Sequence, residues 1–302
     1  MIMQIRIGTR NSKLALIQTN MVIEKITKYF PKAECLVVPI ITTGDKITDR
    51  NLYDIGGKAL FLKEIEEQLS AKTIDIGVHS LKDVPGVLPG GLEIVAVLER
   101  EDPRDCFVSF RYKSLDELPI GTKVGSSSVR RRVLINRIRP DLEVVQFRGN
   151  INTRLDKLKG GEVDAAILAC AGLRRGGWFD SSFCFPIGVE DMLPSAGQGI
   201  IGIEIRSDNE EIRSICAKIN HESTWRLARA ERAFLSYLDA SCDTPMSAYA
   251  VYQENQIIAN YMLANFEGSK IEYCRKISTI LNAEEDGIEA AKELQKLFLY
   301  KA

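Results

Sequence analysis

Strand-like and helix-like segments alternate through the first two thirds of the chain, and this order constrains the fold more than any other feature. Apolar, β-branched runs typical of buried strands lie at residues 4–8, 36–41, 74–78 and 92–98. Ser12 can cap the first intervening helix, whose apolar stripe is Leu14, Ile17 and Met21. Because parallel strands need such crossover segments, the order predicts a mostly parallel sheet covered by helices.

The alternation starts again after a polar segment at residues 99–105. Further strands are expected at residues 106–110, 123–125, 143–147 and 164–170, with helices at 129–138 and 150–158. This pattern indicates a second α/β domain. Another polar break covers residues 190–198, and one more strand follows at 200–205. A strand that resumes after such a break can return to the first sheet.

The last part of the chain has a different pattern. A helix is expected over residues 223–238, followed by strands at 248–252, 257–263 and 270–277 and a final helix. Short polar turns separate the strands, which indicates antiparallel hairpins. We therefore predict an α/β plus α+β chain with two doubly wound lobes, residues 1–99 with 200–218 and residues 100–199, and a small C-terminal antiparallel-sheet domain, residues 219–302.

Composition excludes several classes of protein. Hydrophobic residues make up 45% and charged residues 27% of the chain, which is typical of a globular protein and excludes general disorder. The net charge of -1 argues against a polycation that binds nucleic acid. No apolar stretch is long enough for a membrane helix, and the N-terminus lacks a signal-peptide pattern, so we expect a cytoplasmic protein.

Metal and disulfide chemistry are not expected either. Seven cysteines are scattered without a CxxC pair, which disfavours both a disulfide framework and a zinc site. The chain has only two histidines, His79 and His221, which disfavours histidine-based metal sites and catalytic triads.

The first candidate site is basic. Basic side chains strongly outnumber acidic ones between residues 123 and 159, and they gather at two expected helix starts, GSSSVRRR at 125–132 and RGNINTR at 148–154. A helix N-terminus disfavours cations, and its free N–H groups attract anions. Arginine binds carboxylates bidentately, so we predict a site for a carboxylate ligand. The alternative is a solvated basic face, which suits Arg132 best.

The second candidate is the segment HSLKDVPG at 79–86, which follows an expected buried strand. Ligands of open α/β sheets bind at the carboxyl ends of strands, and this would place Asp83 in the basic cleft. Asp83 is equally suited to cap the turn at 84–86. For His79, a packed and hydrogen-bonded role is favoured over a role as a base.

The third candidate is Cys242. The other cysteines lie in apolar strand or helix patterns, where a thiol is a small buried hydrophobe. Cys242 lies in the small-residue loop DASCDTP at 239–245, where an accessible nucleophilic thiol is expected. Without a histidine partner it is a poor protease-like nucleophile, so a covalent carrier is the better interpretation.

Together these motifs resemble the porphobilinogen deaminase (hydroxymethylbilane synthase) family over essentially the whole chain. The resemblance rests on the order of RIGTRNSKLA at 6–15, GGKALF at 56–61, HSLKDVP at 79–85, EREDPRD at 99–105, GSSSVRR at 125–131, RGN at 148–150 and PSAGQG at 194–199. The most specific signature is Glu231-Arg232 followed by CDTP at 242–245.

The resemblance implies a monomer with two lobes like those of anion-binding proteins and a third domain. It implies condensation of four porphobilinogen molecules, with release of ammonia, into the linear tetrapyrrole hydroxymethylbilane. A dipyrromethane cofactor, itself made from substrate, is implied to be held by a thioether to Cys242, with Asp83 as the catalytic carboxylate. The residues implied to bind cofactor or substrate are Arg10, Ser12, Lys82, Arg130, Arg131, Arg148 and Arg154, with Lys58, Phe61, Ser80, Ser127, Arg175 and Gln198 as weaker matches.

The residue types suit this chemistry. Each substrate carries an acetate and a propionate, so a growing chain accumulates carboxylates that arginines can hold. Loss of ammonia leaves a cationic azafulvene, which a carboxylate such as Asp83 would stabilise. Two positions depart from the family pattern: Ala240 replaces the usual glycine and should stiffen the loop, and Asp54 replaces a frequent lysine and removes a basic contact.

Two other functions share some of these features. A non-catalytic two-lobed anion receptor would have the cleft and the arginines, but it would not need Cys242 and would usually carry an export signal. An RNA-binding protein would use the basic 123–159 stretch, but exposed aromatic residues are then expected and Phe147 is the only aromatic residue there.

Overall fold

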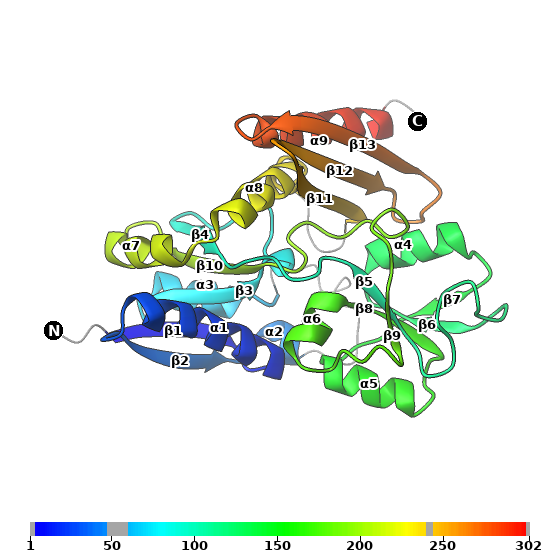
Figure 1. Cartoon of the computed structure of the whole chain (residues 1–302), viewed down its shortest axis with the longest axis horizontal. Helices are drawn as coiled ribbons and strands as arrows, with labels where there is room; N and C mark the ends of the chain where they lie inside the picture. Colours follow the sequence, from blue (N-terminus) through cyan, green and yellow to red (C-terminus); the bar gives the residue numbers. More distant parts are fainter. Residues whose placement is uncertain (1–3, 47–59, 240–243, 300–302) are drawn as a thin grey trace.

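The computed structural model describes residues 4–46, 60–239 and 244–299, and these form three sheets with their helices (Figure 1). Two α/β lobes lie side by side, and a small domain with an antiparallel sheet lies above both in this view. The predicted fold class is confirmed.

The first lobe is a five-stranded sheet in the order β2-β1-β3-β10-β4. β1 pairs parallel with β2 and β3, whereas β10 is antiparallel to both β3 and β4. The strand after the second polar break therefore does return to the first sheet. The strands are β1 (Gln4–Arg10), β2 (Glu34–Ile40), β3 (Ile76–Ser80), β4 (Leu92–Val97) and β10 (Ile201–Arg206), and the helices are α1 (Lys13–Tyr29), α2 (Thr43–Lys46), α3 (Lys63–Ser70) and α7 (Glu210–Ile219).

Helix α1 begins where predicted but buries a different face. Ser12 caps it, with its hydroxyl accepting a hydrogen bond from the N–H of Ala15. Its buried residues are Gln18, Thr19, Val22 and Ile26, whereas the predicted stripe of Leu14, Ile17 and Met21 is half-buried. The stripe prediction is wrong because the two polar side chains find partners inside the fold: Gln18 hydrogen-bonds Ser80, and Thr19 donates to a main-chain carbonyl.

The second lobe repeats the plan with the strand order β7-β6-β8-β5-β9. β6 is parallel to β7 and β8, and β5 is antiparallel to its two neighbours. The sequence analysis missed the short β9 and the helix α6. The elements are β5 (Asp105–Val108), β6 (Lys123–Gly125), β7 (Glu143–Val145), β8 (Ala165–Ala169), β9 (Cys184–Pro186), α4 (Val129–Ile138), α5 (Ile151–Lys159) and α6 (Cys170–Arg175).

The chain passes between the lobes twice, and the two crossing segments touch. The N–H of Glu101 donates to the carbonyl of Gly199 at 2.9 Å. Gly199 has φ +86°, and a Cβ there would lie 2.4 Å from the Glu101 carbonyl oxygen. Only glycine suits this close approach, so the contact explains the last glycine of the PSAGQG motif.

The third domain packs helices α8 (Glu222–Tyr237) and α9 (Ala283–Leu299) on one face of an antiparallel sheet. Its strands are β11 (Met246–Gln253), β12 (Gln256–Ala264) and β13 (Ile271–Thr279), joined as hairpins. Phe234 and Tyr261 meet in its core with their ring centroids 4.8 Å apart. None of the helices in the described part of the chain combines the length and hydropathy needed to cross a bilayer.

A cluster of titratable side chains is buried inside the first lobe. His79 Nε2 lies 2.8 Å from Glu204 Oε2, and both side chains are almost fully buried. His79 thus has the packed, hydrogen-bonded position that its sequence context favoured. Glu66 of α3 lies close by, and burial together with the Glu204 charge raises its pKa from the ordinary value of 4.5 to about 7.

Glu66→Gln should therefore stabilise the protein at alkaline pH. The folded protein binds the Glu66 proton more tightly than the unfolded chain, because the folded-state pKa is raised. The resulting stabilisation is complete below pH 4.5 and is lost as the pH rises to about 7. The free energy of unfolding can be measured with urea at pH 5 and at pH 8. The difference between variant and wild type should shift in favour of the variant by at least about 1 kcal/mol from pH 5 to pH 8. Glu24→Gln, at an exposed position of α1, is the control. Equal pH dependence in all three proteins would contradict this account.

Candidate functional site

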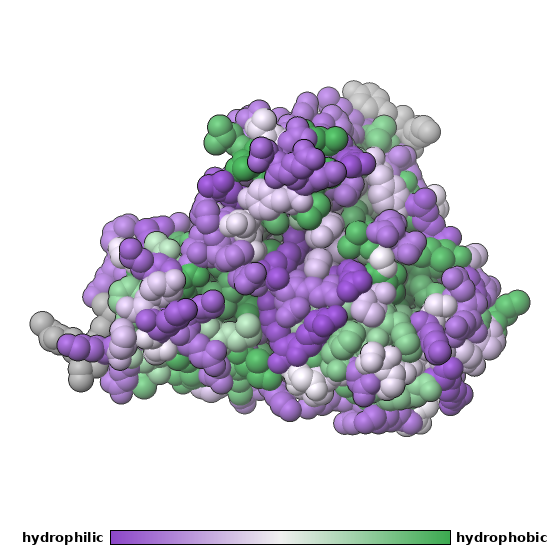
Figure 2. All heavy atoms as spheres, in the orientation of Figure 1, coloured by the Kyte–Doolittle hydropathy of each residue, from purple (hydrophilic) through white to green (hydrophobic). Residues whose placement is uncertain are grey.

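A large cavity lies where the lobes and the third domain meet. Its volume is about 1270 Å³, more than the ~300–1,000 Å³ of an ordinary small-molecule pocket. Figure 2 shows a hollow lined by hydrophilic residues at the centre of this face. The carboxyl ends of β1, β3 and β6 and the starts of α1, α4 and α5 open into it, which is the expected ligand edge of parallel sheets.

The predicted site residues that the structure describes all line this one cavity. Their separation in the sequence shows that the fold brings them together. They are Arg10, Ser12, Phe61, Ser80, Lys82, Asp83, Ser127, Arg130, Arg131, Arg148, Arg154, Arg175 and Gln198. Lys58 and Cys242 lie outside the described residues, as do Asp54 and Ala240.

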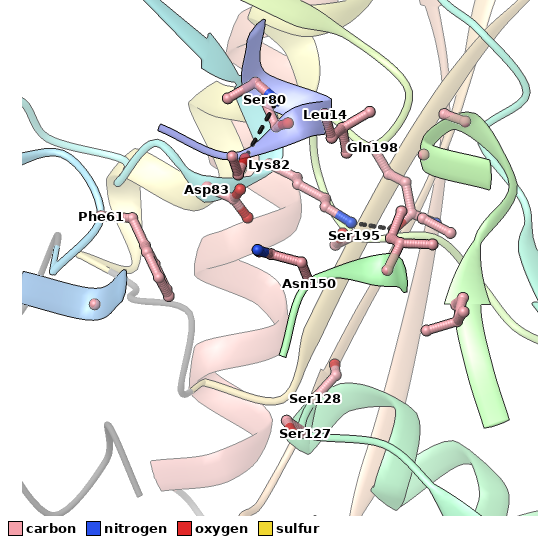
Figure 3. Close-up of a pocket in the computed structure, with 18 of the residues that line it drawn as sticks. Leu14, Phe61, Ser80, Lys82, Asp83, Ser127, Ser128, Asn150, Ser195 and Gln198 are labelled. Atoms are coloured by element: carbon pink, nitrogen blue, oxygen red, sulfur yellow. Dashed lines mark hydrogen bonds between the residues drawn. The ribbon is translucent and has the colours of Figure 1, made fainter. Parts of the chain in front are cut away.

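The segment after β3 turns into the cavity as a single turn of 3-10 helix over Leu81–Asp83. Lys82 Nζ donates to Gln198 Oε1 at 3.4 Å, which joins the first lobe to the second crossing segment. Burial and the neighbouring Arg131 charge lower the pKa of Lys82 to about 8. The Asp83 carboxylate points toward the space between Phe61 and Asn150 (Figure 3).

Arg130 and Arg131 form a buried ion cluster with one carboxylate, that of Asp105. Arg130 Nη2 lies 2.8 Å from Asp105 Oδ2, and Arg131 Nη2 lies 2.6 Å from Oδ1. Gln198 also donates to Oδ1. Burial alone would raise the pKa of Asp105, but the two guanidinium groups hold it well below its usual range.

This cluster corrects the sequence interpretation in two ways. The solvated-face alternative is wrong for Arg130 and Arg131, which are 5% and 7% exposed. Their positive charge is also half neutralised by Asp105, which the sequence analysis did not single out. Arg132 is not simply solvent-facing, because its guanidinium stacks 4.8 Å from the Phe266 ring centroid.

Three other arginines of the cavity form no direct ion pair with a carboxylate of the described residues. No carboxylate of the described residues lies within ion-pair distance of Arg148, Arg154 or Arg175, and the Nε atom of each is buried without a hydrogen-bond partner. Burial lowers the pKa of Arg154 and of Arg175 to about 10. A buried polar atom without a hydrogen-bond partner is costly, so these three donors are suited to an anionic ligand.

The start of α5 supports the same conclusion. Its N-cap residue, Asn150, makes no side-chain capping bond, and residues 149–153 line the cavity. The first turn of a helix has free N–H groups and the positive end of the helix dipole, and both favour an anion. The basic helix start predicted from the sequence is thus part of the cavity wall.

On the first-lobe side, Arg10 is held by two neighbours. Its Nη2 lies 2.5 Å from Asp45 Oδ1, and its guanidinium lies 4.2 Å from the Phe61 ring centroid. The Arg10 charge keeps the pKa of Asp45 low despite burial. The sequence analysis missed Asp45, and no motif marked it.

The third domain is joined to the two crossing segments by Glu231 of α8. This fully buried carboxylate accepts hydrogen bonds from Arg100 Nη1 at 2.6 Å, from the Gly197 N–H at 2.7 Å and from the Ala250 N–H at 2.8 Å. Arg100 and Gly197 belong to the two crossing segments. Glu231 therefore ties both crossings to the third domain.

Comparisons with known proteins agree on one family. The family model "Porphobilinogen deaminase, dipyromethane cofactor binding domain" matches residues 5–214, and "Porphobilinogen deaminase, C-terminal domain" matches residues 225–296. The porphobilinogen deaminase of Rickettsia akari (strain Hartford) is 55% identical over 293 residues, which cover 97% of each chain. That of Rickettsia prowazekii (strain Madrid E) is 54% identical over 97% of this chain and 98% of its own.

Among solved structures, a likeness is found to an arginine-specific periplasmic binding protein of Salmonella typhimurium. Its sequence is 15% identical, the TM-score is 0.42, and the match covers 72% of this chain and 92% of that protein.

Arg131→Leu should destabilise the fold, because it breaks a buried ion pair and leaves Asp105 with a single cation. The expected loss of unfolding free energy is ~3–5 kcal/mol, measured by urea denaturation. Arg137→Leu makes the same change farther along α4, where the guanidinium is exposed and contacts Tyr273. It should cost less than about 1 kcal/mol. Equal losses for the two variants would show that the Asp105 cluster does not hold the lobe together.

Proposed function

The chain belongs to the porphobilinogen deaminase family, whose members condense porphobilinogen into hydroxymethylbilane, and on this premise we propose which of its residues carry out the reaction. The proposal places the condensation in the large cavity, with Asp83 as the catalytic carboxylate and Cys242 as the attachment point of the cofactor. The observation that carries it is the set of cavity arginines whose buried Nε atoms have no hydrogen-bond partner, Arg148, Arg154 and Arg175.

The cavity suits a dipyrromethane group. Each pyrrole of such a group carries two carboxylates, and the unpartnered Nε atoms of the three arginines are donors in need of acceptors of this kind. Lys82 and the start of α5 add further donors. When bound, the cofactor supplies the free pyrrole position to which substrate is joined. The residues proposed to hold it or the growing chain are Arg10, Ser12, Lys58, Phe61, Ser80, Lys82, Ser127, Arg130, Arg131, Arg148, Arg154, Arg175 and Gln198.

Cys242 is the proposed attachment residue for reasons of sequence and of its described neighbour. It is the cysteine of the CDTP signature, and Thr244, two residues later, lines the cavity. The six other cysteines are buried or half-buried within the sheets and helices.

Asp83 is the proposed catalytic group because it is the unpaired acid of the site. Asp45 and Asp83 are the carboxylates that line the described part of the cavity, and Asp45 is held by Arg10. Asp83 has no ion-pair partner among the described residues, while the charges of Lys82 and Arg154 lie close by. It is therefore available for a cation that forms during the reaction.

The proposed role of Asp83 is electrostatic. When the protonated amino group of porphobilinogen leaves as ammonia, the C–N bond electrons leave with the nitrogen. The methylene carbon stays on the ring, and together they form an azafulvenium cation. A fixed carboxylate beside the pyrrole N–H lowers the energy of that cation and can accept its proton. The surrounding arginines keep the substrate carboxylates away from Asp83, so the cation and the acid side chains have separate partners.

We also propose that the chain acts as a cytoplasmic monomer whose only partner is porphobilinogen, without nucleic acid or membrane. The net charge of -1 supports this, and so does Phe147, which is buried and therefore unavailable to stack on a base. A non-catalytic anion receptor is disfavoured because the chain belongs to a family of enzymes.

Cys242→Ser should lack the pyrrole adduct and be inactive, because a serine hydroxyl is a far weaker nucleophile than a thiolate. Intact mass of the purified protein measures this directly. The control is Cys274→Ser in β13 of the third domain, which should keep both the adduct and activity. An adduct that survives in Cys242→Ser would overturn the assignment.

Asp83→Asn should keep the fold and the cofactor but turn over ~10²-fold more slowly or worse, because the amide keeps the shape and loses the charge. A rate assay combined with intact mass of the intermediates carrying one, two and three substrates measures both properties. If Asp83 only caps the turn, Asp83→Asn would turn over briskly, and Asp83→Ala would show a loss of stability instead.

A further inference from the structure

The signature Glu231-Arg232 contains one residue whose role is not yet accounted for. Glu231 holds the two crossing segments, as described above. Arg232, the next residue on α8, points to a different part of the first lobe. Its Nη2 donates to the carbonyl of Pro85 at 2.9 Å, and its Nη1 donates to the carbonyl of Val84 at 3.3 Å.

These two carbonyls belong to the residues that directly follow Asp83. Arg232 is largely buried, and no carboxylate of the described residues lies within ion-pair distance of it. Burial lowers the pKa of Arg232 to about 10, with the Glu204 charge acting in the opposite direction. A guanidinium that donates to two consecutive carbonyls restricts the path of that main chain.

The same stretch of chain is packed against α8 on two further sides. Val84 and Leu81 belong to one apolar cluster with Ala228 of α8. A Cβ at Gly86 would lie 2.7 Å from the main-chain oxygen of Leu235, so the backbones of the two segments are in direct contact. The segment that presents Asp83 is thus docked along α8 from residue 81 to residue 86.

We propose that Arg232 is a positioning residue that fixes the Asp83 carboxylate by holding the two peptide groups after it. This rests on the proposed catalytic role of Asp83. A shift of about 1 Å in a reacting group costs as much as 10²-fold in rate. The third domain then contributes to the chemistry of the first lobe, although Arg232 is absent from the cavity lining.

Arg232→Leu should lower kcat by ~10–100-fold while the KM for porphobilinogen changes less than about threefold, because the arginines that bind the carboxylates are untouched. The adduct measured by intact mass should remain complete. Arg232→Lys keeps a donor for one carbonyl and should recover part of kcat. Arg229→Leu is the matched control, because Arg229 lies one turn earlier on α8 in an exposed ion pair with Glu284, and its kinetics should equal wild type.

Gly86→Ala tests the same docking without removing a charge. Its Cβ would meet the α8 backbone and push the segment away, so a fall in kcat at constant KM is again expected. Thermal unfolding shows whether Arg232→Leu folds. If it does not, Gly86→Ala and Arg232→Lys still test the proposal. Wild-type kcat in folded Arg232→Leu, or in both Arg232→Lys and Gly86→Ala, would overturn the proposal.

A double variant separates this proposal from the role of Asp83 itself. If Arg232 acts through Asp83, Arg232→Leu should change kcat less than about twofold in an Asp83→Asn background. If the two losses multiply instead, Arg232 acts independently and the positioning role is wrong, while the catalytic role of Asp83 stands. Brisk turnover by Asp83→Asn alone would refute the catalytic role, and the positioning role with it.

Discussion

The buried cluster of Asp105 with Arg130 and Arg131 is the interaction on which the rest of the site depends. Two guanidinium groups at the start of α4 would repel each other and the helix dipole if no acid lay between them. Asp105 is brought to them by β5, which begins where the chain has just crossed from the first lobe. Gln198, from the second crossing, completes the cluster. One carboxylate therefore joins a sheet, a helix start and a crossing segment.

The cluster also divides the cations of the cavity into two kinds. Arg130 and Arg131 are paired inside the protein, as Arg10 is with Asp45. Arg148, Arg154 and Arg175 keep buried Nε atoms without partners. The paired groups are held by acids of the protein, and the other three offer buried donors that a ligand can meet. A ligand with several carboxylates can bind the three unpaired arginines without breaking an ion pair of the protein.

The third domain completes this arrangement through one helix. Two consecutive residues of α8 contact different parts of the two lobes. Glu231 binds the crossing segments, and Arg232 binds the end of the segment that carries Asp83. Because adjacent side chains on a helix point about 100° apart, a single rigid element reaches both places. The sequence that follows α8 contains Cys242, so the same helix precedes the proposed attachment loop.

Most element types and the membership of the site were predictable from the sequence, because they depend on local patterns. Apolar runs identified the strands of both lobes except β9, and the candidate site residues that the structure describes all line one cavity. The short β9 and α6 were missed because three to six residues carry too little periodicity. The stripe of α1 was misjudged because Gln18 finds its partner, Ser80, on a different element.

Only the tertiary structure decided which charges are free. Nothing local distinguishes Arg131 from Arg148, since both stand at basic helix starts, yet one is bound to Asp105 and the other is not. Pairing depends on which carboxylate the fold brings within about 3 Å, and that carboxylate is distant in sequence, as Asp105 is from Arg131. Sequence alone therefore determined where the cations and the candidate acid stand in the chain. The packing of the lobes and of α8 determined which of them face a ligand and which hold the protein together.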